Sequence, residues 1–241
     1  MSETPRIDAI STRWSLVRRA HLEGKPETVG EARQILVMRY AMAVRKYLGG
    51  ILRDSEQADE LSQDVIVRML RGDFAGADPN RGRFRDLLKT AVRNIAHKHW
   101  EKSKVRKTVD AELDLVSSTD APNEEAWQTA WQGTVVEHVW DMLEEDERQE
   151  KGVPAFTVLK LRTQYPEESS DQLAERLSIQ MGTAIRPDAW RQMLRRSRIK
   201  FAEALVEEVR MGLDDPSSAS VQEELAAMGL LEYVSGVIEI Q

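Results

Sequence analysis

The sequence predicts an all-α protein made of two helical domains joined by an acidic linker. Its 241 residues include only 13 glycines and 8 prolines, and 31% of them are charged, which is typical of a helix-rich chain. Apolar residues recur at spacings of three and four in successive segments, and no segment alternates apolar and polar residues as a half-buried strand does. Charge also changes sign along the chain in long blocks, which indicates separate modules.

The blocks of charge suggest where these modules lie. Residues 1–107 carry 22 basic and 14 acidic side chains, and residues 108–152 carry 2 and 13. Residues 153–212 carry 10 and 8, and residues 213–241 carry 0 and 6. We predict, with these boundaries, an N-terminal helical domain, an acidic linker with a helix, a second helical domain and an acidic C-terminal extension. The alternation favours two modules that face nucleic acid, although each block alone is also compatible with a solvated surface.

Three helices are expected first. Residues 7–22 and 29–52 show helical periodicity on either side of the turn-like segment 23–26. Asp54 followed by Gln57 is a capping pair for a third helix that runs to about residue 70. The inward side of this third helix is expected to hold Ala58, Leu61, Val65, Met69 and Leu70. Its outward row is expected to hold Glu56, Glu60, Gln63, Asp64 and Val67, with Asp59 beside it.

A loop and a strongly basic helix follow. Residues 72–82 are rich in Gly, Asp and Asn, which predicts a loop. Residues 81–107 contain ten basic and two acidic side chains. Read as a helix, this stretch has a buried stripe of Phe84, Leu87, Leu88, Ala91, Val92, Ile95 and His99. The opposite side carries Arg85, Lys89, Arg93, His97, Trp100 and Lys104. Cations beside an aromatic ring suit phosphates and bases, although a large aromatic side chain is also compatible with a core position.

The remaining segments complete the helical pattern. Residues 108–123 predict a linker, and a helix is expected from residue 124 to the acidic cluster 144–147. The inward side of that helix should hold Trp127, Trp131, Val135, Val139, Met142 and Leu143. Ser170 is a cap for a helix over 171–177. Pro187 suits the start of a helix that reaches about residue 211, and a last short helix is expected at 221–228.

A short helix, a turn and a helix with an outward row of arginines form the sequence outline of a helix-turn-helix. The row consists of Arg191, Arg195 and Arg198, with Arg186 just before the helix. In this motif the second helix enters the major groove, where arginines hold phosphates or guanine edges. Arginine rows are also common on surface helices, so the pattern alone does not decide between DNA binding and a solvated face.

Two stretches of the chain resemble conserved regions of bacterial RNA polymerase sigma factors. Residues 57–70 and 78–102 are similar to region two, on the residues Asp59, Glu60, Leu61, Gln63, Arg81, Gly82, Phe84, Leu88, Arg93 and Asn94. Residues 170–209 resemble region four. The two regions in this order, without additional domains, are similar to the extracytoplasmic-function (ECF) group. The turn between Ile179 and Trp190 is longer than in the family pattern, which leaves the start of the second helix open over several residues.

The resemblance implies partners and roles for the site residues. The acidic helix would dock on the clamp helices of the largest subunit of core RNA polymerase, through Glu56, Asp59, Glu60, Gln63 and Asp64. Residues 72–83 would hold a flipped promoter base, and the basic helix would hold the non-template strand. Region four would contact the second-largest polymerase subunit and read a distal promoter element, and an anti-sigma factor is a further partner that the family allows. The expected DNA-binding residues are Arg81, Arg83, Arg85, Lys89, Arg93, Asn94, His97, Trp100, Arg186, Arg191, Arg195 and Arg198.

Other classes of function find little support. The chain has no phosphate-binding glycine loop and no zinc-protease pair, and His97 and His99 diverge on a helix. It has no cysteine and no run long enough for a membrane span, and its first residues lack the apolar core of a signal peptide. We therefore expect a cytoplasmic protein with no catalytic residue, metal or cofactor and no membrane partner.

Two rival functions stay open beside the sigma factor. One is a stand-alone helix-turn-helix regulator that never binds polymerase, and the outward carboxylates of residues 56–64 argue against it. The other is an interaction protein that mimics a sigma factor without acting on DNA, and the basic helix argues against that.

Overall fold

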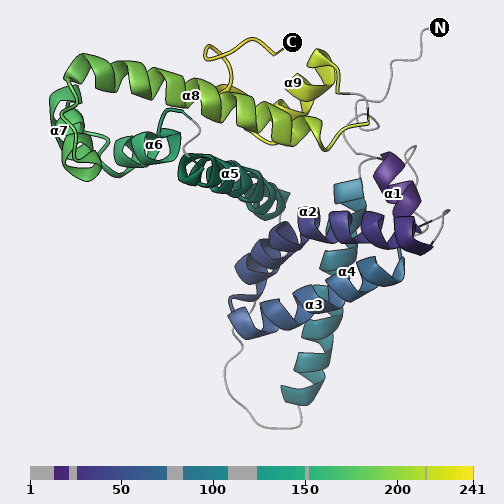
Figure 1. The fold of residues 1–241 in the computed structure, drawn as a ribbon. Helices are drawn as coiled ribbons and strands as arrows, with labels where there is room; N and C mark the ends of the chain where they lie inside the picture. Colours follow the sequence, from purple (N-terminus) through teal and green to yellow (C-terminus); the bar gives the residue numbers. More distant parts are fainter. Residues whose placement is uncertain are drawn as a thin grey trace, which may run out of the picture. The chain divides into compact units, whose positions relative to one another are not determined.

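A computed structural model describes residues 14–21, 26–74, 84–107, 124–149, 152–214 and 216–240. All regular secondary structure within these residues is helical, which confirms the predicted all-α class (Figure 1). Contacts divide the chain into unit 1, Met1–Thr134 with Gly212–Pro216, and unit 2, Val135–Met211 with Ser217–Gln241. The predicted limits of independent domains at residues 107 and 152 stay a prediction. No helix of the described part is both long and apolar enough to cross a bilayer.

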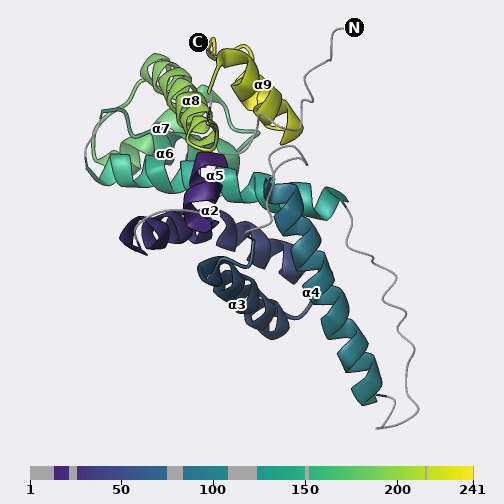
Figure 2. The ribbon, with the colours of Figure 1, turned by 90° about the vertical axis from the view of Figure 1, so that its right-hand side faces the viewer.

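Unit 1 is a helical bundle. It contains α1 (Trp14–His21), α2 (Pro26–Leu52), α3 (Ser55–Arg71), α4 (Phe84–Lys107) and the start of α5 (Glu124–Arg148). The long α2 is the centre of the bundle, because α1, α3 and α4 all pack on it (Figure 2). Most apolar residues that the periodicity places inward are buried, among them Leu36, Val44, Val65, Leu88 and Val92.

Aromatic side chains fasten α4 and α5 to α2. Tyr40 of α2 stacks on Trp131 of α5 with ring centroids 5.0 Å apart, and it meets Phe84 of α4 edge-on at 5.3 Å. Two turns further along α2, Tyr47 meets Trp127 edge-on at 5.1 Å. The expectation that the tryptophans of α5 serve helix packing is confirmed. The first part of α5 therefore belongs to the bundle of unit 1.

Local capping sets the limits of α3. The backbone N–H of Gln57 donates to the Asp54 carboxylate at 3.0 Å, and the Gln57 side-chain amide donates to the same carboxylate at 2.6 Å. The predicted capping pair is confirmed. Gly72 ends the helix with φ +82°, a left-handed conformation that glycine adopts without steric cost.

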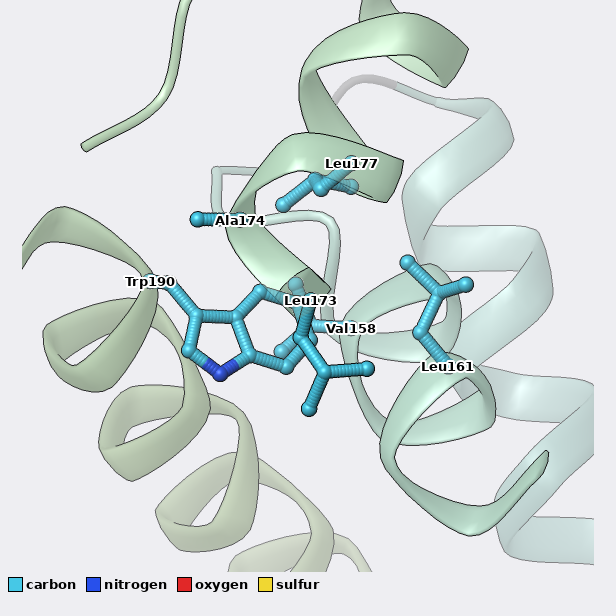
Figure 3. Close-up of a cluster of buried hydrophobic side chains, with 6 residues drawn as sticks. All are labelled: Val158, Leu161, Leu173, Ala174, Leu177 and Trp190. Atoms are coloured by element: carbon cyan, nitrogen blue, oxygen red, sulfur yellow. The ribbon is translucent and has the colours of Figure 1, made fainter. Parts of the chain in front are cut away.

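Unit 2 contains the remainder of α5, then α6 (Ala155–Gln164), α7 (Ser170–Met181), α8 (Pro187–Arg210), α9 (Ser218–Ala227) and the 3₁₀ turn η3 (Leu231–Tyr233). The core under the α7–α8 pair is shown in Figure 3, where the Trp190 ring lies among apolar side chains from α6 and α7. Those side chains are Val158, Leu161, Leu173, Ala174 and Leu177.

Two features of unit 2 differ from the sequence predictions. The N-cap of α7 is Ser169 and not Ser170, because Ser169 has extended backbone angles and exchanges hydrogen bonds with Gln172. The helix α6 was not predicted, since it has no capping side chain of its own. Instead the Glu147 carboxylate of α5 accepts hydrogen bonds from the backbone N–H (3.0 Å) and hydroxyl of Thr157.

Three apolar residues that were expected to point inward are exposed. Leu70, Leu87 and Met142 have 45%, 38% and 38% of their surface exposed. Each lies at the edge of an apolar stripe, where periodicity gives the direction of the side chain but not the reach of the neighbouring helix. The outward assignment of Val67, at 40% exposed, was correct.

We expect Trp131→Ala to destabilise unit 1 by about 3 kcal/mol, because a large buried ring is removed from the packing of α2. Hydrogen exchange should speed up in the amides of α2. The control is Met142→Ala on the same helix, which should cost less than about 0.5 kcal/mol because the side chain is exposed. Equal effects of the two substitutions would contradict the packing role of Trp131.

Candidate nucleic-acid interface

The first two residues of α4, Phe84 and Arg85, are buried and do not face solvent. Arg85, which was expected on the outward cationic side, is buried at 7% exposed. The cause is its neighbour Phe84, which packs between Tyr40 and Phe74 and draws the first turn into the bundle. The predicted outward position of Arg85 is therefore wrong. Lys89, one turn later, has only 12% of its side chain exposed and lies 3.7 Å from the Asp86 carboxylate.

The middle of α4 presents the predicted polar face. Arg93, Asn94 and His97 are exposed, and His97 lies 3.7 Å from Glu101 on the same helix. Trp100 is half-buried, so only part of its ring is available to a partner. The exposed basic surface of α4 thus starts at Arg93, two turns later than the sequence indicates.

A pocket of about 300 Å³ lies where the end of α3 meets α4. Its lining combines apolar and polar side chains, namely Arg68, Asp73, Phe74, Leu87, Thr90, Ala91 and Asn94. The spacing of Leu87, Thr90 and Asn94 places them on one side of α4. Asn94 was predicted as a DNA-binding residue, and Asp73 and Phe74 lie at the start of the segment 72–83 that was expected to hold a flipped base. Leu87 had been assigned to the core, and its exposure is explained by its position in the pocket wall.

The carboxylates predicted to bind polymerase lie along α3. Three of them and the Gln63 amide form a continuous exposed row, here called the docking ridge, which consists of Glu56, Glu60, Gln63 and Asp64. Asp59 is different, because Arg45 of α2 donates to its carboxylate at 2.5 and 3.3 Å. This hydrogen bond lowers the pKa of Asp59 below its usual value. Asp59 therefore ties α3 to α2, whereas the docking ridge points to solvent.

Helix α3 and the basic helix α4 are connected by a hydrogen bond. His99 Nε2 of α4 lies 2.8 Å from Gln57 Oε1 on α3, and Gln57 also bonds to the helix cap Asp54. His99 was expected inside and is half-buried. Through this contact the start of α3 is fixed relative to the second half of α4.

The structure defines the turn between α7 and α8, which the sequence left open. Gly182 ends α7 with φ +64°. The Ser178 hydroxyl then accepts a hydrogen bond from the backbone N–H of Ile185 at 2.8 Å and donates to the carbonyl of Ala174 at 2.7 Å. The turn is thereby pinned to α7, and α8 begins at Pro187 as predicted.

The arginines at the start of α8 point to solvent. Arg186, Arg191, Arg195 and Arg198 are all exposed, and Arg191 forms an ion pair with Asp188 on the same helix. Arg196 is exposed as well and was not predicted, because it lies outside the three-and-four spacing of the row. Arg81 and Arg83, the other predicted site residues, lie outside the described residues.

Comparison with known proteins gives one family match. Residues 36–106 match the family model of sigma-70 region 2. No curated protein and no solved structure matches the chain. The matched segment runs from α2 to the end of α4, so it includes the docking ridge and the pocket. This similarity supports a part in RNA polymerase binding and promoter recognition.

An ion pair that positions α7 predicts a pH dependence of stability. Arg176 donates to the Glu168 carboxylate at 2.5 and 2.6 Å, and its guanidinium lies 3.8 Å from the centre of the Tyr165 ring. These hydrogen bonds lower the pKa of Glu168 below its ordinary value of 4.5. A lowered pKa in the folded state stabilises the fold at pH values above the unfolded pKa, and the contribution is lost as the pH falls through the folded pKa.

We therefore expect the wild-type protein to have a higher Tm than Glu168→Gln at neutral pH. The difference should persist down to about pH 5 and disappear in more acidic solution, as followed by thermal circular dichroism. Glu167→Gln, at the exposed neighbouring position, is the control and should change Tm little at any pH. A difference that grows on acidification would contradict this assignment.

Proposed function

We propose that this protein is a sigma factor of the ECF type. It binds core RNA polymerase through the docking ridge and holds melted promoter DNA at α4 and the pocket. It reads a second promoter element as duplex with α7 and α8. The proposal includes no catalytic step. The observation that carries it is the pocket between α3 and α4, inside the segment that is similar to sigma-70 region 2.

The pocket has the size and chemistry to receive a base. A volume of about 300 Å³ is at the lower end of the range of small-ligand pockets. Phe74 supplies an apolar surface, and the Asn94 amide can both donate and accept hydrogen bonds at a base edge. Arg68 can pair with a phosphate. These contacts would offset the few kcal/mol that extruding a base costs.

The docking ridge supports the polymerase contact. Exposed carboxylates in a row suit a basic partner surface, because complementary charge guides association and excludes wrong partners. By the resemblance to sigma factors, this partner would be the clamp helices of the largest polymerase subunit. The second-largest subunit would receive unit 2, and an anti-sigma factor would compete for these surfaces.

The start of α8 supports reading of duplex DNA. Arg191, Arg195 and Arg198 lie on one side of the helix that follows the pinned turn. This is the position from which a recognition helix contacts the major groove. An arginine there holds a phosphate or reads a guanine edge.

Transcription with purified core polymerase on a library of promoter fragments separates this function from its rivals. A sigma factor binds core and selects promoters. Failure to bind core would favour the stand-alone regulator. Core binding without selection of any promoter would favour the sigma mimic.

We expect Asn94→Ala to reduce promoter opening about tenfold, which corresponds to the roughly 1–3 kcal/mol of a good base contact. Reactivity of unpaired thymines to permanganate measures the opening, and affinity for core polymerase should be unchanged. Gln34→Ala removes an exposed amide from α2 instead and should leave opening intact. Equal opening by Asn94→Ala and wild type would contradict the role of the pocket.

Charge reversal on the docking ridge should weaken binding to core polymerase and leave DNA binding intact, which is the reverse of the pattern expected for Asn94→Ala. We expect Glu60→Lys combined with Asp64→Lys to weaken core binding by at least about tenfold, because like charges then face the basic partner. Binding of the variant to promoter fragments without polymerase should not weaken. Glu31→Lys, a reversal on the exposed side of α2, is the control. If it weakened core binding as much, the docking surface would not be on α3.

A further inference from the structure

One continuous stripe runs along the whole of α8 and changes character halfway. Its members recur at spacings of three and four, which places them on one side of the helix: Arg191, Arg195, Arg198, Ala202, Val206 and Val209. The three arginines are exposed, whereas the three apolar residues are buried at 0%, 5% and 3% exposed. The side of α8 that is open and cationic in its first turns is therefore covered from residue 202 onward.

The C-terminal segment, residues 217–240, provides the cover. Helix α9 contacts α8 and lies along its carboxyl-terminal half (Figure 1). Val221, Leu225, Leu230 and Val234 are completely buried, and the Ser218 hydroxyl donates to the carbonyl of Ile240, which closes the segment on itself. The segment is thus folded, and its apolar side chains are buried.

Helix α5 packs on a different side of α8. Phe201 meets Trp140 at 5.8 Å, Lys200 pairs with Asp146 at 2.9 Å, and Glu208 lies 3.6 Å from His138. Residues 200, 201 and 208 lie away from the stripe on the helix. Helix α6 packs on α8 through the core around Trp190, so we infer that α9, which also contacts α8, covers the stripe beyond Arg198.

The covering segment is also acidic. Residues 217–240 contain 4 acidic and 0 basic side chains, and Glu223, Glu232 and Glu239 are exposed. Val206 lies about 12 Å along the helix axis from Arg198. This distance from the covered stretch to the last arginine is comparable to the Debye length of about 10 Å at 0.1 M salt, so a net negative charge on the covering segment repels phosphates there most strongly at low salt.

We propose that the C-terminal segment is an acidic barrier that ends the DNA-binding face of α8 after Arg198. It covers the continuation of that face and repels phosphates beside it. This inference rests on the proposed DNA-binding role of α8. The consequence is that duplex contacts are limited to the first turns of the helix. Binding to non-specific DNA, which depends mainly on phosphate contacts, is suppressed more than binding to the correct element.

The test measures binding of the full-length chain to a duplex of random sequence by fluorescence anisotropy. We expect Glu223→Gln with Glu232→Gln to bind about fivefold more tightly at low salt, with the gain declining as salt increases. The matched control, Glu137→Gln with Asp141→Asn, removes two carboxylates from exposed positions of α5 in the same unit. It should change the affinity by less than about twofold. Circular dichroism checks that both variants keep the wild-type helix content.

A second pair of variants shows where the added affinity arises. Arg195→Ala with Arg198→Ala should weaken binding, and adding these changes to the Gln variant should abolish its gain. Three results would overturn the barrier proposal. These are an equal gain in the α5 control, no gain in the Gln variant, and a gain that survives loss of the arginines. Wild-type affinity in the arginine variant alone would instead overturn the DNA-binding role of α8.

Discussion

The arrangement of unit 1 depends on the packing of Tyr40 between Phe84 and Trp131. This side chain joins three helices, because it stacks on α5 and meets the first residue of α4 edge-on. Phe84 in turn contacts Phe74, the last described residue before the loop. The entry of α4 and the exit of α3 are thereby held side by side. Phe74 also lines the pocket between the two helices, so the aromatic cluster borders the pocket at one end.

The same constraint decides which cations of α4 are available to a partner. Burial of Phe84 takes Arg85 into the bundle and leaves Lys89 mostly covered, so the exposed basic surface begins at Arg93. In unit 2, two acidic residues are likewise engaged in internal contacts. Glu147 caps α6 and Asp146 pairs with Lys200, which means that the carboxylates at the end of α5 are partly internal contacts.

The features that could be predicted from the sequence are those that neighbouring residues determine. The cap of α3, the outward carboxylates and the start of α8 at Pro187 all follow from residues within one or two turns of each other. The failures depend on distant contacts. Helix α6 is capped from another helix by Glu147, and Arg85 is buried because Phe84 meets α2. A helical periodicity gives the direction of a side chain but not the neighbour that covers it. For that reason Arg68, Leu87, Thr90 and Ala91 were not predicted as pocket residues, although Asn94 and the segment that contains Asp73 and Phe74 were.

The two flanks of helix α3 make different contacts. On one flank Asp59 is tied to Arg45 of α2. On the other, Gln57 bonds to His99 and Arg68 lines the pocket with α4. The docking ridge lies between the two flanks and makes none of these contacts. A partner bound to the ridge therefore holds α3 without disturbing the pocket. Because α4 contacts α3 near both ends of α3, such a partner also orients the face of α4 that begins at Arg93.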